Sequence, residues 1–134
     1  MKCKSKFLII TTIPLSLGFF KGQIQVLKKK FYVELVSSSG SKLDEICRTE
    51  KVIGHPIEMA REISIIKDIF SLLKLIKLFI KTKPNVVHGS TPKAGLLSMF
   101  AALLTNVPVR IYYVHGLRYE GSLGLKKKIL ILME

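Results

Sequence analysis

Two histidine–glycine pairs in this sequence each close an apolar stretch, a place where a polar side chain can do chemistry. His88 and Gly89 end the stretch "NVVHG", and His115 and Gly116 end the stretch "VRIYYVHG". An imidazole at a strand end can donate a hydrogen bond to a phosphate or a sugar hydroxyl, or carry a proton. One such histidine is usually a structural group, but two in one chain indicate a binding or catalytic site.

The residues after the first pair predict the start of a helix. Thr91 is a favourable N-cap, Pro92 suits the first helical position, and Ser90 adds a second hydroxyl. Lys93 falls in the first turn, where a cation is unfavourable for the helix alone, so it indicates an anion nearby. The alternative, a solvated lysine in an ordinary strand–helix turn, carries equal weight. Gly89 allows a close approach of the backbone.

The loop after the second pair adds two charged candidates, and the cysteines add none. Arg118 and Glu120 could bind polar groups of a substrate, although most exposed loop charges are only solvated. Cys3 and Cys47 have neither zinc-site nor CxxC spacing, which favours a reducing compartment.

The surrounding sequence alternates between apolar strands and helices. Strands are expected at 6–12, 31–40, 51–57, 85–89 and 109–116, and helices at 18–30, 41–50, 64–83 and 92–106, with another beginning after 121. Strands that are apolar on both sides and separated by helices predict a parallel, Rossmann-like α/β sheet covered on both faces. Ligands bind at the carboxyl edge of such a sheet, so His88 and His115 are expected to open into one shared hollow.

The length and charge of the chain limit the possible functions. Its 134 residues suit one domain, and its formal net charge of +13 favours polyanions: nucleic acid, anionic lipid or phosphorylated substrates. The basic, apolar beginning imitates a signal peptide, but Thr11, Thr12 and Pro14 interrupt it, so a first strand is favoured. The sequence contains no uninterrupted run of about 18 apolar residues, so no membrane-spanning helix is predicted. Because the sequence stops in the apolar run 129–133, an incomplete, truncated domain is expected.

The expected helix at 64–83 is unusually hydrophobic. Lys67, Lys74, Lys77 and Lys81 form one narrow stripe, while eleven Ile, Leu and Phe residues spread over the rest. The helix either covers the core with its lysines facing water, or rests part of its apolar arc on a bilayer surface with the lysines near lipid phosphates.

The segments "VHGSTPKAGLL" and "VRIYYVHGL", within Val86–Glu120, resemble the N-terminal half of family 4 glycosyltransferases. The sequence is most similar to enzymes of bacterial capsule, O-antigen and exopolysaccharide synthesis that act on undecaprenyl-diphosphate-linked sugars. The resemblance implies the acceptor-side half of a GT-B fold, in which two Rossmann domains transfer a sugar from a nucleotide-sugar. It also implies retention of anomeric configuration, with no metal or other cofactor.

The same resemblance implies roles for individual residues. His115 matches a strand-end histidine that faces the transferred sugar and the donor phosphate, and the turn 90–93 matches a segment on the acceptor side. The loop after the first strand normally carries glycines near the donor, and here only Gly18 is present. Residues 1–134 would then form one N-terminal domain without its C-terminal donor-binding domain. Catalysis by this part alone is not expected, because most of the electrostatic support of the transition state would be missing.

The partners implied are a nucleotide-sugar donor, a lipid-linked glycan acceptor, an anionic membrane surface and the C-terminal domain. The expected location is cytoplasmic, peripheral on the inner face of the cytoplasmic membrane. The alternative is a non-catalytic basic α/β binding module that serves as a partner subunit or binds nucleic acid. Nucleic acid is not expected, because the lysines are scattered and no helix-turn-helix, zinc or RNA-binding signature is found.

Overall fold

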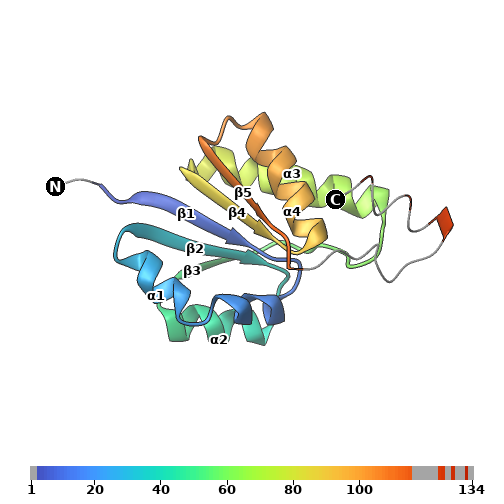
Figure 1. Ribbon diagram of the computed structural model, residues 1–134. Coiled ribbons are helices and arrows are strands. Elements are labelled where there is room, and N and C mark those ends of the chain that lie inside the picture. The colour runs from blue at the N-terminus through green and yellow to red at the C-terminus, as the bar shows by residue number, and fades with distance from the viewer. Residues whose placement is uncertain (1–2, 116–123, 126–127, 129–131, 133–134) are drawn as a thin grey trace.

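A computed structural model describes residues 3–115, 124–125, 128 and 132, and these include a five-stranded sheet, whose strands lie side by side (Figure 1). The strand order is β3-β2-β1-β4-β5, and all four neighbouring pairs are parallel. The strands are β1 (Ser5–Ile10), β2 (Phe31–Ser37), β3 (Ile53–Pro56), β4 (Val86–Ser90) and β5 (Val109–Tyr113). The structure confirms the predicted Rossmann-like parallel sheet, and the segment that imitates a signal peptide supplies its central strand.

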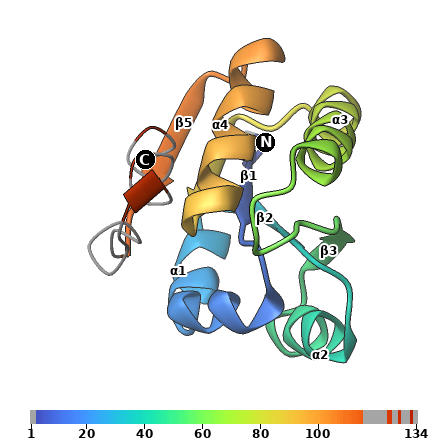
Figure 2. The ribbon, with the colours of Figure 1, turned by 90° about the vertical axis from the view of Figure 1, so that its right-hand side faces the viewer.

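Helices cover both faces of the sheet (Figure 2). The helical elements are the 3-10 helix η1 (Pro14–Phe20) and the α-helices α1 (Gln23–Lys28), α2 (Ser41–Glu50), α3 (Ile65–Thr82) and α4 (Pro92–Leu104). η1, α1 and α2 lie on one face, and α3 and α4 lie on the other. The face changes between β1 and β4, as in other doubly wound sheets.

The core has two halves because the side chains of each strand alternate between the faces. On β1, Phe7 and Ile9 contribute to the half beneath η1, α1 and α2. Leu8 and Ile10 contribute to the half beneath α3 and α4. The near-continuous apolar sequence of β1 therefore reflects burial on both sides.

Two local predictions differ from the structure. The single helix expected at 18–30 is divided into η1 and the six-residue α1, because Gly22 adopts a φ of 82° between them. The fourth strand continues to Ser90, so His88 lies within β4 and not at its end. The helix expected after 121 lies outside the continuously described residues.

Candidate functional site

A crevice opens where the chain changes from one face of the sheet to the other. β1 and β4 are neighbours, but η1 follows β1 on one face while α4 follows β4 on the opposite face. Such a switch point, at the carboxyl ends of the strands, is where α/β sheets bind ligands. A pocket of about 180 Å³ lies here, and we call it the switch-point crevice; its lining is Thr12, Ile13, Ser16, Arg61, Thr91, Pro92 and Lys93.

Thr12 and Thr91 join the two strand ends across this crevice. Their hydroxyl oxygens lie 2.7 Å apart, and the Thr12 amide donates to Thr91 Oγ1 at 3.2 Å. Thr91 occupies the N-cap position of α4 as predicted, but its side chain makes no capping hydrogen bond. The expected cap is replaced because the Thr91 hydroxyl is directed to Thr12. Thr91 also adopts a φ of 84°, a strained conformation for a β-branched residue.

Lys93 is buried, and the anion beside it belongs to the protein. Its amine contacts the Asp68 carboxylate of α3 at 2.8 and 3.0 Å and donates to the Glu62 carbonyl. The Asp68 carboxylate also accepts from the Ser64 amide at 3.3 Å. The lysine in the first turn of α4 is thus neutralised by α3. Lys93 is therefore neither a free charge for a substrate anion nor a solvated lysine, the two alternatives that the sequence offered.

Ser90 and His115 form a polar pair at the ends of β4 and β5. The Ser90 hydroxyl is fully buried and hydrogen-bonded to His115 Nε2, while the His115 side chain is exposed. The His115 ring stacks on the Phe19 ring with a centroid separation of 4.3 Å. It meets the Tyr113 ring edge-on with a centroid separation of 4.6 Å. Three neighbours therefore fix the orientation of an imidazole at the rim of the sheet, as a binding or proton-transfer group requires.

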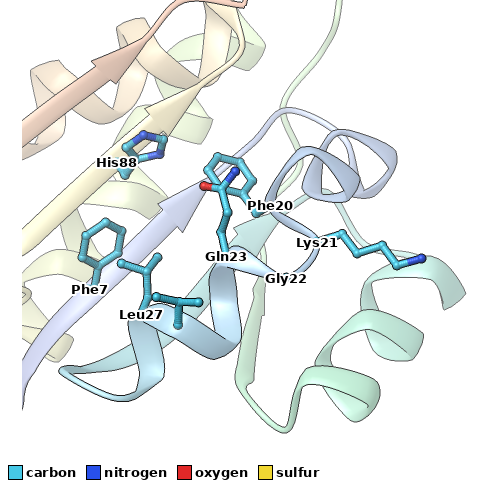
Figure 3. A pocket seen from close by; sticks show the side chains of 8 residues that line it. Phe7, Phe20, Lys21, Gly22, Gln23, Leu27 and His88 are labelled. Carbon is cyan, nitrogen blue, oxygen red and sulfur yellow. The ribbon is translucent and has the colours of Figure 1, made fainter.

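His88 lies deeper on the same face and borders a different cavity. It is 9% exposed, and its Nδ1 has no hydrogen-bond partner among the described residues. Burial lowers the pKa of His88 below its ordinary value of 6.5, and the nearby His115 lowers it further. His88 is therefore neutral at pH 7. It borders a largely apolar pocket of about 400 Å³ with Phe7, Phe20 and residues of α1 (Figure 3).

The sequence predicted that His88 and His115 open into one shared hollow, and the structure does not show this. Phe20 meets His88 edge-on at 5.2 Å and His115 at 6.5 Å, so aromatic rings fill the space between them. The pocket beside His88 is not lined by His115. Both histidines instead contact the ring of Phe20. The polar groups at the carboxyl edge of the sheet are those of His115, Ser90 and the switch-point crevice.

The candidate glycines have different surroundings. A Cβ at Gly89 would lie 2.7 Å from Gly95 Cα and would clash with Ser98 Oγ, so Gly89 allows α4 to approach the sheet. The close approach predicted for this glycine is thus to a helix. Gly18 lies in η1, has open space around its Cα, and borders a pocket shared with α2.

The predicted candidates Gly116, Arg118 and Glu120 lie outside the described residues. Three polar residues of the crevice, Thr12, Ser16 and Arg61, were missed by the sequence reasoning. Thr12 follows the first strand as Thr91 follows the fourth, and this parallel could have identified it. No sequence signal distinguishes Arg61. Within residues 3–115, no group of three or more His, Cys, Asp or Glu side chains could hold a metal ion.

Two curated relatives match nearly the whole chain. The chain is 44% identical over 130 residues to the capsular polysaccharide biosynthesis glycosyltransferase CapM of Staphylococcus aureus, covering 96% of this chain and 33% of the relative. It is 32% identical over 124 residues to the UDP-Gal:alpha-D-GlcNAc-diphosphoundecaprenol alpha-1,3-galactosyltransferase of Escherichia coli, covering 89% of this chain and 32% of the relative. The chain thus spans about a third of the length of these relatives.

A solved structure shares the fold of this chain, and a family model identifies its family. The fold matches a UDP-N-acetylglucosamine 2-epimerase of Rickettsia bellii with a TM-score of 0.67 at 19% identity, over 95% of this chain and 35% of that chain. This likeness shows the fold alone. The model of the family described as "Glycosyl transferase 4-like" matches residues 13–133. With that match over most of its length, the chain belongs to the glycosyl transferase 4-like family.

Proposed function

We propose that this chain is the acceptor-binding N-terminal domain of a retaining glycosyltransferase of bacterial capsule, O-antigen or exopolysaccharide synthesis. The enzyme would transfer a hexosyl or N-acetylhexosaminyl group, without a metal ion, from a nucleotide-sugar to an undecaprenyl-diphosphate-linked glycan. The name of the S. aureus relative supports a role in capsule synthesis. The name of the E. coli relative supports a nucleotide-sugar donor and an undecaprenyl-diphosphate-linked acceptor.

The observation that carries this proposal is the pairing of a hydroxyl-rich crevice with an oriented histidine at one sheet edge. Thr12, Ser16 and Thr91 offer hydroxyls to a sugar, and Arg61 brings a cation beside them. A guanidinium matches a diphosphate in charge and in hydrogen-bond geometry. Sugar hydroxyls and a diphosphate are the polar groups that the proposed acceptor presents.

His115 is the proposed catalytic residue of this domain. Its Nε2 is engaged by Ser90, and Phe19 stacks on its ring. In the proposed arrangement its Nδ1 contacts the transferred sugar or the donor phosphate. Ser90 then acts as a positioning residue that holds the imidazole at the edge of the cleft.

The rest of the chemistry is assigned to protein beyond this chain. In the proposed enzyme, the C-terminal domain binds most of the nucleotide-sugar and stabilises the charge that develops on its diphosphate. The 134-residue chain is then expected to bind acceptor without transferring sugar. The proposed place of action is the cytoplasmic face of the membrane, where such an acceptor presents its diphosphate.

A chimera with the S. aureus relative tests the proposal directly. This chain would replace the matched third of CapM, and the chimera would be expressed in a S. aureus strain that lacks CapM. We expect capsule production, measured with a capsule-specific antibody, to be restored. A stable, well-expressed chimera that restores no capsule would contradict the proposed function.

A further inference from the structure

The outer surface of α3 is apolar although it faces away from the sheet. Ser71, Leu75 and Phe79 are buried and mark the side that faces the core. Six apolar side chains face outward on this helix and are between 52% and 74% exposed: Ile65, Ile66, Ile69, Phe70, Leu73 and Ile80. Burial against the sheet therefore explains only one side of α3, and the opposite side is apolar without a partner among the described residues.

Lysines border this apolar surface in a regular row. Ile66, Leu73 and Ile80 recur every seven residues along the outer side of α3, and Lys67, Lys74 and Lys81 each follow one residue later. One residue turns an α-helix by about 100°, so the lysine row lies at the margin of the apolar row. The single acidic residue of α3, Asp68, is bonded to Lys93. The outer surface of α3 thus combines apolar and positive character.

The apolar surface continues onto α4, which packs beside α3 (Figure 2). Lys93 of α4 contacts Asp68 of α3, so its side of α4 faces α3. Phe100 and Leu104 follow Lys93 by seven and eleven residues and lie on the same side of the helix. Phe100, Leu103 and Leu104 are each more than half exposed. We call these residues, with the six outward-facing apolar residues of α3, the α3–α4 surface.

We propose that the α3–α4 surface rests on an anionic lipid bilayer, with both helices in the plane of the interface. An interfacial helix buries its apolar face at the boundary between headgroups and acyl chains while flanking cations meet lipid phosphates. The lysine row at the margin of the apolar row matches this arrangement. A second copy of the chain fits less well, because it would bring an identical lysine row and the same +13 formal net charge.

The position of this surface connects it to the proposed acceptor site. The Lys93–Asp68 ion pair joins the first turns of α3 and α4, and Lys93 also lines the switch-point crevice. A bilayer beneath the two helices would therefore lie beside the crevice. This inference rests on the proposed function and extends it by naming the surface through which the domain reaches a lipid-linked substrate. Within residues 3–115, none of the helices has the length and hydrophobicity that a membrane span requires.

Cosedimentation of the 134-residue chain with lipid vesicles tests the inference without any glycan acceptor. We expect the chain to bind vesicles of equal parts phosphatidylglycerol and phosphatidylcholine at least about tenfold more tightly than pure phosphatidylcholine vesicles. The double substitution Lys67→Glu/Lys74→Glu, within the lysine row, should weaken binding to the anionic vesicles about tenfold or more. Its matched control is Lys29→Glu/Lys30→Glu after α1, which changes the net charge equally and should weaken binding much less.

A second pair of variants isolates the apolar contribution. Ile66→Gln/Leu73→Gln should weaken vesicle binding, while Leu15→Gln/Val26→Gln, also at exposed apolar positions, should not. Circular dichroism melts check that all variants stay folded. Equal effects of both lysine variants, or no preference for the anionic vesicles, would overturn the inference. So would a concentration-dependent dimer that Ile66→Gln/Leu73→Gln abolishes. Because the vesicles contain no acceptor, failure here is separate from failure of the capsule assay.

Discussion

The hydroxyl oxygens of Thr12 and Thr91 lie 2.7 Å apart and join the carboxyl ends of β1 and β4 at the switch point. Thr91 Oγ1 also accepts from the Thr12 amide, and the strained φ of Thr91 is held in this setting. A hydrogen bond here therefore fixes the shape of the crevice where the two faces of the sheet diverge.

We predict that Thr91→Val, which keeps the shape but removes the hydroxyl, destabilises the domain by about 1–3 kcal/mol. The buried Thr12 amide and hydroxyl would lose this partner, and burying an unsatisfied polar group has a cost of that order. Denaturant unfolding measures the change. Thr105→Val is the control, because the Ala101 carbonyl that its hydroxyl contacts also accepts the Thr105 amide. Equal losses for the two variants would show that the Thr12–Thr91 bond has no special weight.

The five strands and their parallel sheet could be predicted because each strand carries a local signal, whereas the order of the strands comes from the structure. Apolar runs such as those of β1 and β4 end at turn-forming residues, and a parallel sheet covered on both faces requires that pattern. The position of α4 was predictable for the same reason, since Thr91 and Pro92 mark its start.

Pairings between distant segments could not be predicted. Lys93 is neutralised by Asp68, which lies 25 residues earlier and reaches it only through the packing of α3 against α4. The Thr91 hydroxyl has two alternatives, capping its own helix or bonding to Thr12, and only the tertiary structure selects between them. The split of the first helix depends on the backbone conformation of Gly22, and glycine tolerates that conformation without requiring it.

Gly89 is expected to tolerate no side chain, because α4 approaches the sheet at this residue. We predict that Gly89→Ala destabilises the domain by about 1–3 kcal/mol, since the new methyl group would press on Gly95 Cα and Ser98 Oγ. Gly18→Ala is the control, because nothing lies within 4 Å of the position that its methyl group would take, and it should be neutral or slightly stabilising. Thermal unfolding of both variants makes the comparison. A silent Gly89→Ala would indicate that α4 can move away at little cost.

The Lys93–Asp68 pair should behave as a coupled unit. The two side chains are 6% and 18% exposed, so removing either one leaves a poorly solvated charge. We predict that Lys93→Met costs about 3 kcal/mol, and that the double variant Lys93→Met/Asp68→Leu costs less than the sum of the two single variants. Urea unfolding of the four proteins gives the coupling free energy. Simple additivity would mean that the pair is not energetically linked.

His88 should make the domain sensitive to acid. Its pKa is lower in the folded protein than in the unfolded chain, so the folded state binds fewer protons. The stability that His88 contributes is therefore complete above its unfolded pKa of about 6.5 and declines as the pH falls toward the folded pKa. We predict that the wild type loses more stability between about pH 7.5 and pH 5 than His88→Phe does. Parallel losses in thermal unfolding would show that His88 does not titrate differently in the two states.

His115 should be needed for transfer but not for folding. Because its side chain is exposed, His115→Ala in the CapM chimera is expected to lower the melting temperature by no more than about 2 °C. A general acid–base or charge-stabilising role predicts a fall of about 10²-fold or more in capsule synthesis.

Ser90→Ala should cause a smaller fall than His115→Ala, because it frees the imidazole without removing it. Tyr113→Phe is the matched control: it keeps the ring beside His115, measured at 4.6 Å, and removes only a hydroxyl. Full activity of His115→Ala would exclude the proposed catalytic role, while the membrane surface formed by α3 and α4 would be unaffected.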